Sequence, residues 1–276
     1  MGAATSTPLS EARAASASLP TNSRVAVVAG ATGATGRWVV SELLNSNVVT
    51  KVVAVTRNDI SDAKSVFQQV KSEEGYSKLV VAPADWKKMA EKPEDVSLPE
   101  RALETIKSAA NGESCIAFCC LGSAPYTEES DYLAPTAFAH ACKKADQSVG
   151  MSLVSAGGAD PNSMIGYSKT IGRREEAFEG MKFDRLSIFR PAMLLRQDKQ
   201  RTKEKIFLPM VRGGGMYDDL ISPLLLQTPP KYRVDARDVA RAMVFDATHQ
   251  AEEEGTKPTV YSNADIQATA RVAAQE

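Results

Sequence analysis

The 276-residue chain has little of the chemistry that metal centres and disulfide frameworks require. It holds two histidines, His140 and His249, so a histidine-rich metal centre or a His-based catalytic triad has little to draw on. Of its four cysteines, three lie within residues 115–120, a spacing unlike that of zinc sites or disulfide scaffolds. We therefore expect no metal site and a reducing compartment.

An excess of one charge and long apolar runs are also missing. The chain carries 33 Lys and Arg against 34 Asp and Glu, a net charge of −1, so no overall field attracts nucleic acid or an anionic membrane. No apolar run approaches the roughly 20 residues that are needed to span a bilayer. These absences predict a protein with no transmembrane segment and no nucleic-acid partner, located in the cytoplasm.

The N-terminal stretch, residues 1–22, is rich in Ala, Ser and Thr and predicts a flexible extension. Its opening MGAATS fits the pattern for N-myristoylation, which would place an acyl chain on Gly2 and associate the protein weakly with a membrane. A mitochondrial transit peptide is a third interpretation, opposed by the carboxylate of Glu11. An unmodified tail is the first expectation.

The most informative stretch is RVAVVAGATGATGRWVV, residues 24–40, where a short apolar run breaks into glycines and resumes with helical spacing. Val25–Ala29 suits a fully buried strand, and a helix is expected from about Ala34. Glycines in G-x-x-G-x-x-G spacing let the backbone turn tightly and approach a ligand, and the helix N-terminus adds N–H groups that favour phosphate. The expected phosphate-binding residues are Gly30, Thr32, Gly33, Ala34, Thr35 and Gly36.

This spacing differs from the G-x-G-x-x-G of many dehydrogenases, and it lacks the G-K-[ST] ending of a P-loop, which argues against ATP hydrolysis of that type. The alternative is a tight strand–helix turn that binds nothing.

The second expected strand, Lys51–Thr56, decides the cofactor, because the residue that follows it meets the adenosine ribose in such folds. That residue is Arg57, a cation that suits the 2′-phosphate of NADP(H), and Arg37 offers a second cation on the same side. Asp59 would favour NAD(H) if the turn shifted by one or two residues, and a solvated strand end is the remaining alternative. We expect NADP(H).

Strands and helices alternate over roughly 130 residues, which predicts an α/β fold with a doubly wound parallel sheet of the Rossmann type. Further strands are expected at 78–82, 115–121, 151–154 and 185–189, helices at 63–70, 101–110, 132–144 and 167–179, and a charged surface loop at 87–99. Residues 23–276 would form a single domain, in which 196–233 and 250–276 are irregular and form a small substrate lobe.

Ligands of a parallel sheet bind beyond the carboxyl ends of its strands. Leu121 and Gly122, which end the fourth strand, are therefore expected to line the cofactor cleft, and Asp85, after the third, to lie near the adenine ring. The cysteines of the fourth strand are interpreted as small apolar core residues rather than as redox groups.

Ser155 closes the fifth strand and stands 12 residues before Tyr167, at the start of a predicted helix. A serine and a tyrosine at that separation can meet at a carbonyl group. The serine would orient the oxygen by a hydrogen bond, and the phenol would donate a proton while hydride arrives from a nicotinamide.

With these residues in place, the chain resembles the short-chain dehydrogenase/reductase superfamily, and specifically its atypical branch similar to the Tat-interactive protein 2 oxidoreductases. The resemblance rests on the stretches VAVVAGATGATGR, KVVAVTRN, AFCCLGS, SLVSAGGAD, the Tyr167 helix and, above all, KFDRLSIFRPAMLL at 182–195. It implies a Rossmann-like fold and NADP(H), with Arg190, Pro191 and Ala192 covering the nicotinamide end of the cofactor.

The chain departs from that family at one position. Active members carry Y-x-x-x-K, whose lysine lowers the phenol pKa and holds the nicotinamide ribose; here that position is Ile171. Lys169 lies about 200° round the helix from Tyr167, and Arg174 shares the tyrosine's face but begins about 10 Å further along. The resemblance implies an NADP-dependent oxidoreductase acting on an unspecified small carbonyl compound. The alternative is a non-catalytic NADP(H)-binding sensor or scaffold with a protein partner.

Overall fold

The computed structural model describes residues 24–108, 114–123, 125–195, 233–249 and 257–275. Its main sheet is built from β1 (Arg24–Ala29), β2 (Val49–Thr56), β3 (Leu79–Pro83), β4 (Ser114–Cys119), β5 (Gly150–Val154), β6 (Arg185–Phe189) and β9 (Thr259–Tyr261). These seven strands are parallel and run in the order β3-β2-β1-β4-β5-β6-β9. This order confirms the predicted doubly wound, Rossmann-like sheet.

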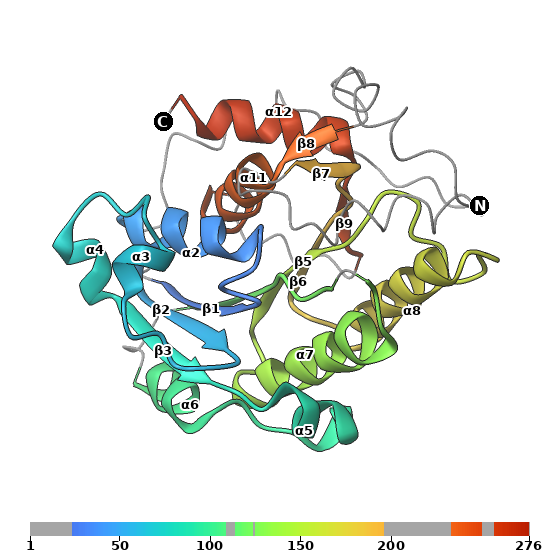
Figure 1. Cartoon of the computed structure of the whole chain (residues 1–276), viewed down its shortest axis with the longest axis horizontal. Coiled ribbons are helices and arrows are strands. Elements are labelled where there is room, and N and C mark those ends of the chain that lie inside the picture. The colour runs from blue at the N-terminus through green and yellow to red at the C-terminus, as the bar shows by residue number, and fades with distance from the viewer. Residues whose placement is uncertain (1–23, 109–113, 124, 196–232, 250–256, 276) are drawn as a thin grey trace.

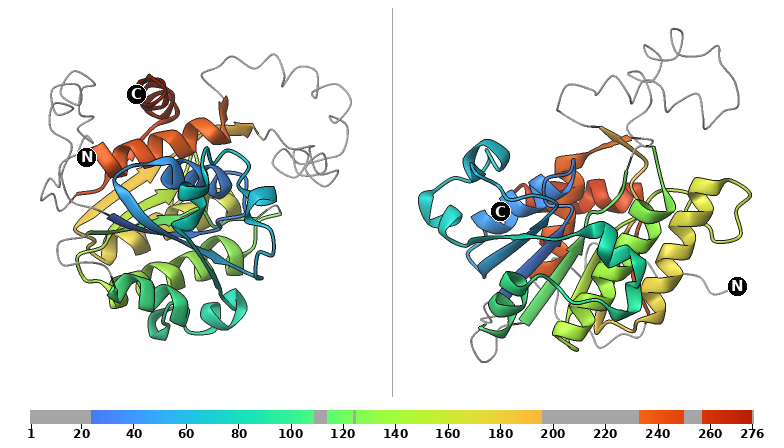
Figure 2. Two further views of the ribbon diagram at one scale, coloured as in Figure 1. Left: turned by 90° about the vertical axis from the view of Figure 1, so that its left-hand side faces the viewer. Right: turned by 60° about the horizontal axis from the view of Figure 1, so that its bottom comes forward.

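The central strands are apolar because both faces of the sheet are covered. One layer consists of α2 (Gly36–Asn45), α11 (Ala236–His249) and α12 (Asn263–Ala273). The opposite layer consists of α5 (Trp86–Glu91), α6 (Glu100–Lys107), α7 (Ala134–Ala145) and α8 (Gly166–Gly180). Figures 1 and 2 show the sheet between these two layers. All six residues of β1 are buried, which places the start of the glycine turn in the centre of the domain.

Smaller elements complete the described fold. They are α3 (Ala63–Val66), α4 (Glu73–Ser77), the 3-10 turn η1 (Pro93–Asp95), the π-helical turn η2 (Glu129–Leu133), and the strands β7 (Met193–Leu195) and β8 (Arg233–Asp235), which pair in parallel as a separate two-stranded sheet. None of the helices in the described part of the chain is both long enough and apolar enough to cross a membrane.

The surface loop expected at 87–99 is wrong, because this stretch holds most of α5 and all of η1. The many charged residues suggested a loop, but they lie on one side of an amphipathic helix. Met89 and Ala90 are buried, while the neighbouring lysines are exposed. Pro93 then limits the helix, since the residue before a proline avoids helical geometry.

The irregular structure expected for 250–276 is also wrong. In its described part, β9 joins the main sheet beside β6, and α12 packs on α11. The Ser262 hydroxyl and the Asp265 carboxylate form a reciprocal capping box at the start of α12. Residues 196–232, 250–256 and 1–23 lie outside the described residues, and with them the N-terminal extension, Gly2 and most of the predicted substrate lobe.

Candidate dinucleotide and catalytic site

The turn after β1 has room only for glycine at two of its positions. Gly30 has a φ of +73°, and a Cβ on it would lie 2.5 Å from the carbonyl oxygen of Cys120. A Cβ on Gly36 would lie 2.0 Å from the carbonyl oxygen of Gly30. The Gly33 amide donates to that same oxygen at 2.9 Å and closes the turn. The backbone therefore holds the start of α2 directly against the end of β1.

The N-terminus of α2 lies at the glycine turn and carries no side-chain cap. Its first turn contains no acidic residue, and Thr35, at the N-cap position, makes no side-chain capping bond. In the first turn, the Arg37 amide donates to Gly33 O at 3.2 Å and the Trp38 amide to Thr35 O at 3.0 Å, so the Gly36 amide is the one that lacks an intrahelical acceptor. A phosphate fits this arrangement, because the glycine cradle, the helix dipole and the exposed Thr32 lie at one point.

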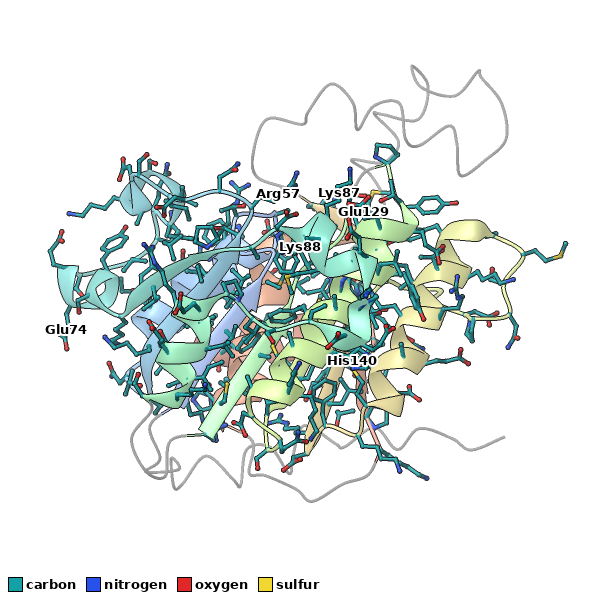
Figure 3. All side chains as sticks on the ribbon, turned by 90° about the horizontal axis from the view of Figure 1, so that it is seen from below. Arg57, Glu74, Lys87, Lys88, Glu129 and His140 are labelled. Carbon is teal, nitrogen blue, oxygen red and sulfur yellow. The ribbon has the colours of Figure 1, made fainter. Side chains whose placement is uncertain are left out.

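Two arginines flank the glycine turn. Arg37 donates from Nε to the Gly33 carbonyl oxygen at 3.2 Å, so its guanidinium is held beside the turn. Arg57 follows β2 directly and is exposed, and Figure 3 shows it toward the same edge of the molecule as Lys87 and Lys88. The carboxylate of Asp59 accepts from the next backbone amide at 3.0 Å, so it serves the loop itself.

The remaining predicted cofactor residues follow β3 and β4. Asp85 is the N-cap of α5 and accepts from the amide of Lys88 at 3.1 Å, a sufficient structural role for its carboxylate. Leu121 is half-buried and Gly122 is exposed. Their strand is joined to the glycine turn, because the Cys120 amide donates to the Ala29 carbonyl oxygen at 3.0 Å.

Ser155 follows β5 and belongs to a buried network that the sequence did not predict. Its hydroxyl donates to Oε1 of Glu175, a carboxylate on α8 that is 3% exposed. Arg190 donates two hydrogen bonds to the same carboxylate, from Nε to Oε1 at 3.0 Å and from Nη2 to Oε2 at 2.5 Å. A serine hydroxyl has one proton to donate, and here Glu175 takes it.

Tyr167 lies at the other end of this arrangement, as the second residue of α8. It precedes Glu175 by eight residues, about 12 Å along a helix axis. Its ring packs against Tyr126 with centroids 5.6 Å apart. Burial raises the pKa of Tyr167, the charge of Arg174 lowers it, and the charge of Asp131 raises it.

The position where the related enzymes carry a lysine is apolar and closed. Ile171 is 1% exposed, whereas Lys169, two residues earlier on the same helix, is exposed to solvent. Arg174 is 2% exposed; it donates from Nη1 to Leu121 O at 3.3 Å and from Nη2 to Val154 O at 2.8 Å. The cation nearest to this face of α8 is therefore an arginine at the ends of β4 and β5.

Asp131 was also missed by the sequence reasoning. It is a 2% exposed residue of η2, and its carboxylate accepts from Ser123 Oγ at 3.0 Å, Thr127 N at 3.0 Å and Ser130 Oγ at 2.8 Å. These bonds fix the loop after β4. Asp131 directly precedes a predicted helix and Glu175 lies within one, and charged residues are ordinary at both places, so the sequence offered no specific signal for either.

The cysteines are free and at least partly buried. Burial raises the pKa of Cys115 to about 12 and that of Cys119 to about 11, so both are neutral thiols near pH 7. This agrees with their interpretation as apolar core residues. Within the described ranges, no three His, Cys, Asp or Glu residues cluster in a way that could hold a metal ion.

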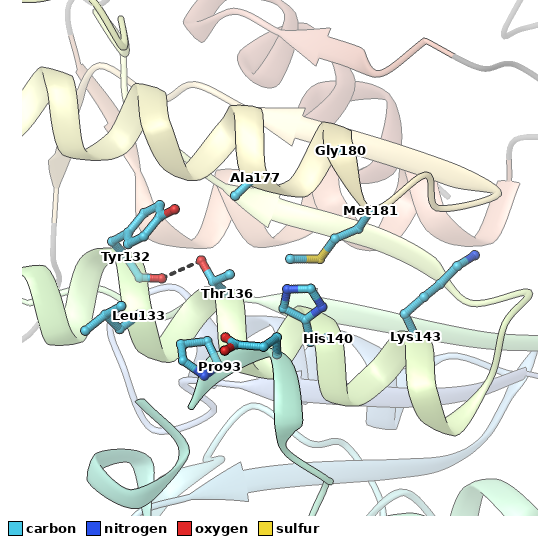
Figure 4. Close-up of a pocket in the computed structure, with 10 residues that line it drawn as sticks. Pro93, Tyr132, Leu133, Thr136, His140, Lys143, Ala177, Gly180 and Met181 are labelled. Carbon is cyan, nitrogen blue, oxygen red and sulfur yellow. Dashed lines mark hydrogen bonds between the residues drawn. The ribbon is translucent and has the colours of Figure 1, made fainter. Parts of the chain in front are cut away.

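A groove of about 650 Å³ lies elsewhere, between α7, the end of α8 and η1. Figure 4 shows His140, Thr136 and Met181 among the side chains that line it. None of the predicted cofactor or catalytic residues borders this groove, so it is separate from the strand-end site.

No model of a known protein family matches the chain. In sequence, Protein HTATIP2 of Rattus norvegicus is 29% identical over 228 residues, 79% of this chain and 78% of that protein. The chain is similar to HTATIP2 and has the fold of the short-chain dehydrogenases/reductases. The resemblance expected from the sequence is thus confirmed.

Solved structures support the fold. The L-sorbose reductase from Gluconobacter frateurii, complexed with NADPH and L-sorbose, has a TM-score of 0.56 at 15% identity, covering 88% of this chain and 96% of that one. Carveol dehydrogenase from Mycobacterium avium, in complex with NAD, has a TM-score of 0.56 at 12% identity, covering 90% and 99%. Proteins of this fold therefore hold either nicotinamide dinucleotide.

Proposed function

We propose that this protein is an NADP(H)-binding oxidoreductase that reduces a small carbonyl compound. The observation that carries the proposal is the glycine cradle: a Cβ on Gly30 or Gly36 would meet a backbone oxygen, and the N-terminus of α2 lies at this turn. Such a cradle binds the pyrophosphate of a dinucleotide through the backbone alone.

Arg57 gives the proposal its preference for NADP(H). It is an exposed cation directly after β2, where the 2′-phosphate of NADP(H) would lie, while Asp59 is engaged in its own loop. Arg37, held to Gly33, adds positive charge on the same side. Charge-assisted bonds to phosphate would favour NADP(H) over NAD(H).

The segment Arg190–Ala192 would cover the nicotinamide end. It is fixed by three bonds: Arg190 N to Tyr261 O at 2.9 Å, Gly157 N to Pro191 O at 2.7 Å, and Ala192 N to Asn263 Oδ1 at 2.9 Å. Gly157 follows β5, and the other two partners come from β9 and the start of α12. These bonds hold the segment just beyond the end of β6.

In the proposed reaction Tyr167 is the proton donor. When bound, the reduced nicotinamide supplies the hydride, and the phenol proton goes to the carbonyl oxygen. For Ser155 to orient that oxygen, its hydroxyl proton must turn away from Glu175. The two bonds from Arg190 keep the carboxylate paired when that happens.

The test begins with titration of the protein with NADPH and NADH, followed by a panel of small carbonyl compounds. We expect binding of NADPH and a turnover that Tyr167→Phe lowers by about 10²–10⁴-fold without weakening NADPH binding. Tyr76→Phe, a phenol bonded to Phe67 O on the other helical layer, is the matched control and should retain turnover. Absence of dinucleotide binding would overturn the proposal.

A second function has its own support. Ile171 is buried where a lysine would assist the tyrosine, and the Ser155 proton is taken by Glu175. Both observations favour a protein that binds NADP(H) without turning it over and serves as a sensor or scaffold. NADPH binding with no turnover across the panel, in both wild type and Tyr167→Phe, would establish this alternative over the first.

A further inference from the structure

Tyr167, Ile171 and Arg174 share one face of α8. They stand at positions i, i+4 and i+7, which lie within about 60° of each other around a helix. Ile171 and Arg174 are 1% and 2% exposed, so this face is turned into the protein. Helical side chains lean toward the N-terminus, which brings the long side chain of Arg174 back toward Tyr167.

The Arg174 guanidinium is a buried cation with few partners. Its Nη1 and Nη2 atoms donate to the carbonyl oxygens of Leu121 and Val154. Its Nε is buried and has no acceptor among the described residues, which also offer it no ion-paired carboxylate. Burying a charge in this way is costly unless something gains from the charge.

The charged groups around Tyr167 leave Arg174 as the cation that acts on its phenol. The charge of Asp131, on η2, acts in the opposite direction and raises the Tyr167 pKa. Lys169, on α8 itself, is exposed. Arg173 is paired with Glu128 at 3.0 Å, on the outer side of the helix.

Glu175 and Arg190 neutralise each other through their two bonds, so they add little net charge to this face. The ring of Tyr126 is the remaining neighbour, with its centroid 5.6 Å from that of Tyr167. The burial of Tyr167 by itself raises its pKa and makes the tyrosinate harder to form.

We propose that Arg174 is a positioning residue for the proposed reductase: its buried guanidinium supplies the positive charge that Ile171 cannot, and stabilises the tyrosinate that remains after Tyr167 has given up its proton. This rests on the proposed function. The hydride of NADPH goes to the carbonyl carbon and the Tyr167 proton to the oxygen, which leaves an alcohol, NADP⁺ and a tyrosinate. Solvent then reprotonates Tyr167.

The direct test is the pKa of Tyr167 in the protein without cofactor, measured as the tyrosinate absorption that Tyr167→Phe removes. Arg174→Gln keeps N–H donors for the carbonyl oxygens but loses the charge, and we expect it to raise the Tyr167 pKa by about one unit. Arg174→Lys should leave the pKa close to that of wild type.

Relocating the charge separates an electrostatic role from a structural one. In the Arg174→Gln background, Ile171→Lys places a cation one turn after Tyr167 and should bring its pKa back down by about one unit. In turnover, Arg174→Gln should shift the alkaline limb of the reduction profile upward with the pKa, and Ile171→Lys should reverse that shift.

The outcomes are distinct from failure of the proposed function, because the spectroscopic titration needs neither cofactor nor substrate. A Tyr167 pKa that is unchanged in Arg174→Gln overturns the role of Arg174, even if the protein binds and uses NADPH. If Arg174→Gln does not fold, the comparison of wild type, Arg174→Lys and Ile171→Lys decides: a Tyr167 pKa that does not respond to the added lysine overturns the proposal.

Discussion

The two halves of the site are built in different ways. The proposed dinucleotide half, from β1 to Arg57, is continuous in sequence and uses backbone atoms: a turn closed by Gly33 N and Gly30 O, and the N-terminus of α2. The proposed catalytic half is assembled from side chains that are far apart in the chain, with Ser155, Glu175 and Arg190 brought together from the end of β5, from α8 and from the end of β6.

This difference determines how each half tolerates change. A backbone cradle tolerates substitutions at positions that have space for a side chain. It loses its shape when a Cβ is added at a crowded glycine. A network of buried charges keeps its shape when one member changes but is left with an uncompensated partner.

The largest effect is expected for Gly36→Ala. The new Cβ would lie 2.0 Å from the Gly30 carbonyl oxygen, so the turn must open. We expect a loss of about 3 kcal/mol in the free energy of unfolding, measured with denaturant, together with loss of NADPH binding. Gly180→Ala, where the Cβ meets nothing within 4 Å, is the control. Equal stability of the two variants would show that the turn is not a rigid cradle.

A smaller effect is expected for Glu175→Gln. The change removes the charge that pairs with Arg190, and a buried pair broken in this way typically costs about 3–5 kcal/mol. Because the Arg190 side chain is 36% exposed, solvent compensates part of this, and we expect about 2 kcal/mol.

Glu176→Gln, an exposed neighbour on the same helix, should change the free energy of unfolding by less than about 0.5 kcal/mol. We expect Glu175→Gln to retain NADPH binding. Loss of that binding would contradict the difference between the two halves.

The smallest effect is expected for Arg57→Ala, because this side chain is exposed and has no structural role in the strand. We expect stability to be unchanged and NADPH affinity to fall about tenfold, equivalent to about 1.4 kcal/mol, with NADH affinity nearly constant. Lys71→Ala, an exposed cation in the segment before α4, is the control. Equal losses for both dinucleotides would refute contact with a 2′-phosphate.

The sequence predicted the strands and the glycine turn better than the buried network of Ser155, Glu175 and Arg190, for a physical reason. The strands are short apolar runs because both faces of the sheet are covered. The glycine turn is recognisable because the residues that form it are adjacent in sequence. Glu175 gave no such signal, since its partners are 20 and 15 residues away and only folding brings them together.

Two other misses have separate causes. β9 has three residues, too few to show a periodic pattern, and it becomes a strand only because β6 offers it an open edge. α5 was hidden by its lysines, which are exposed beside the buried Met89. In both cases tertiary contacts, rather than local preference, decide the structure.

The place of β9 has a consequence for how the protein is made. The segment that would cover the nicotinamide is tied to Tyr261 and Asn263, which are synthesised about 70 residues after it (263 minus 192 is 71). During translation β6 is therefore an unpaired edge, and the catalytic half stays unfinished after the glycine turn has all of its own residues. A chain interrupted before β9 would lack the two partners that fix Arg190 and Ala192, so the order of synthesis places the proposed phosphate cradle before the proposed cover of the nicotinamide.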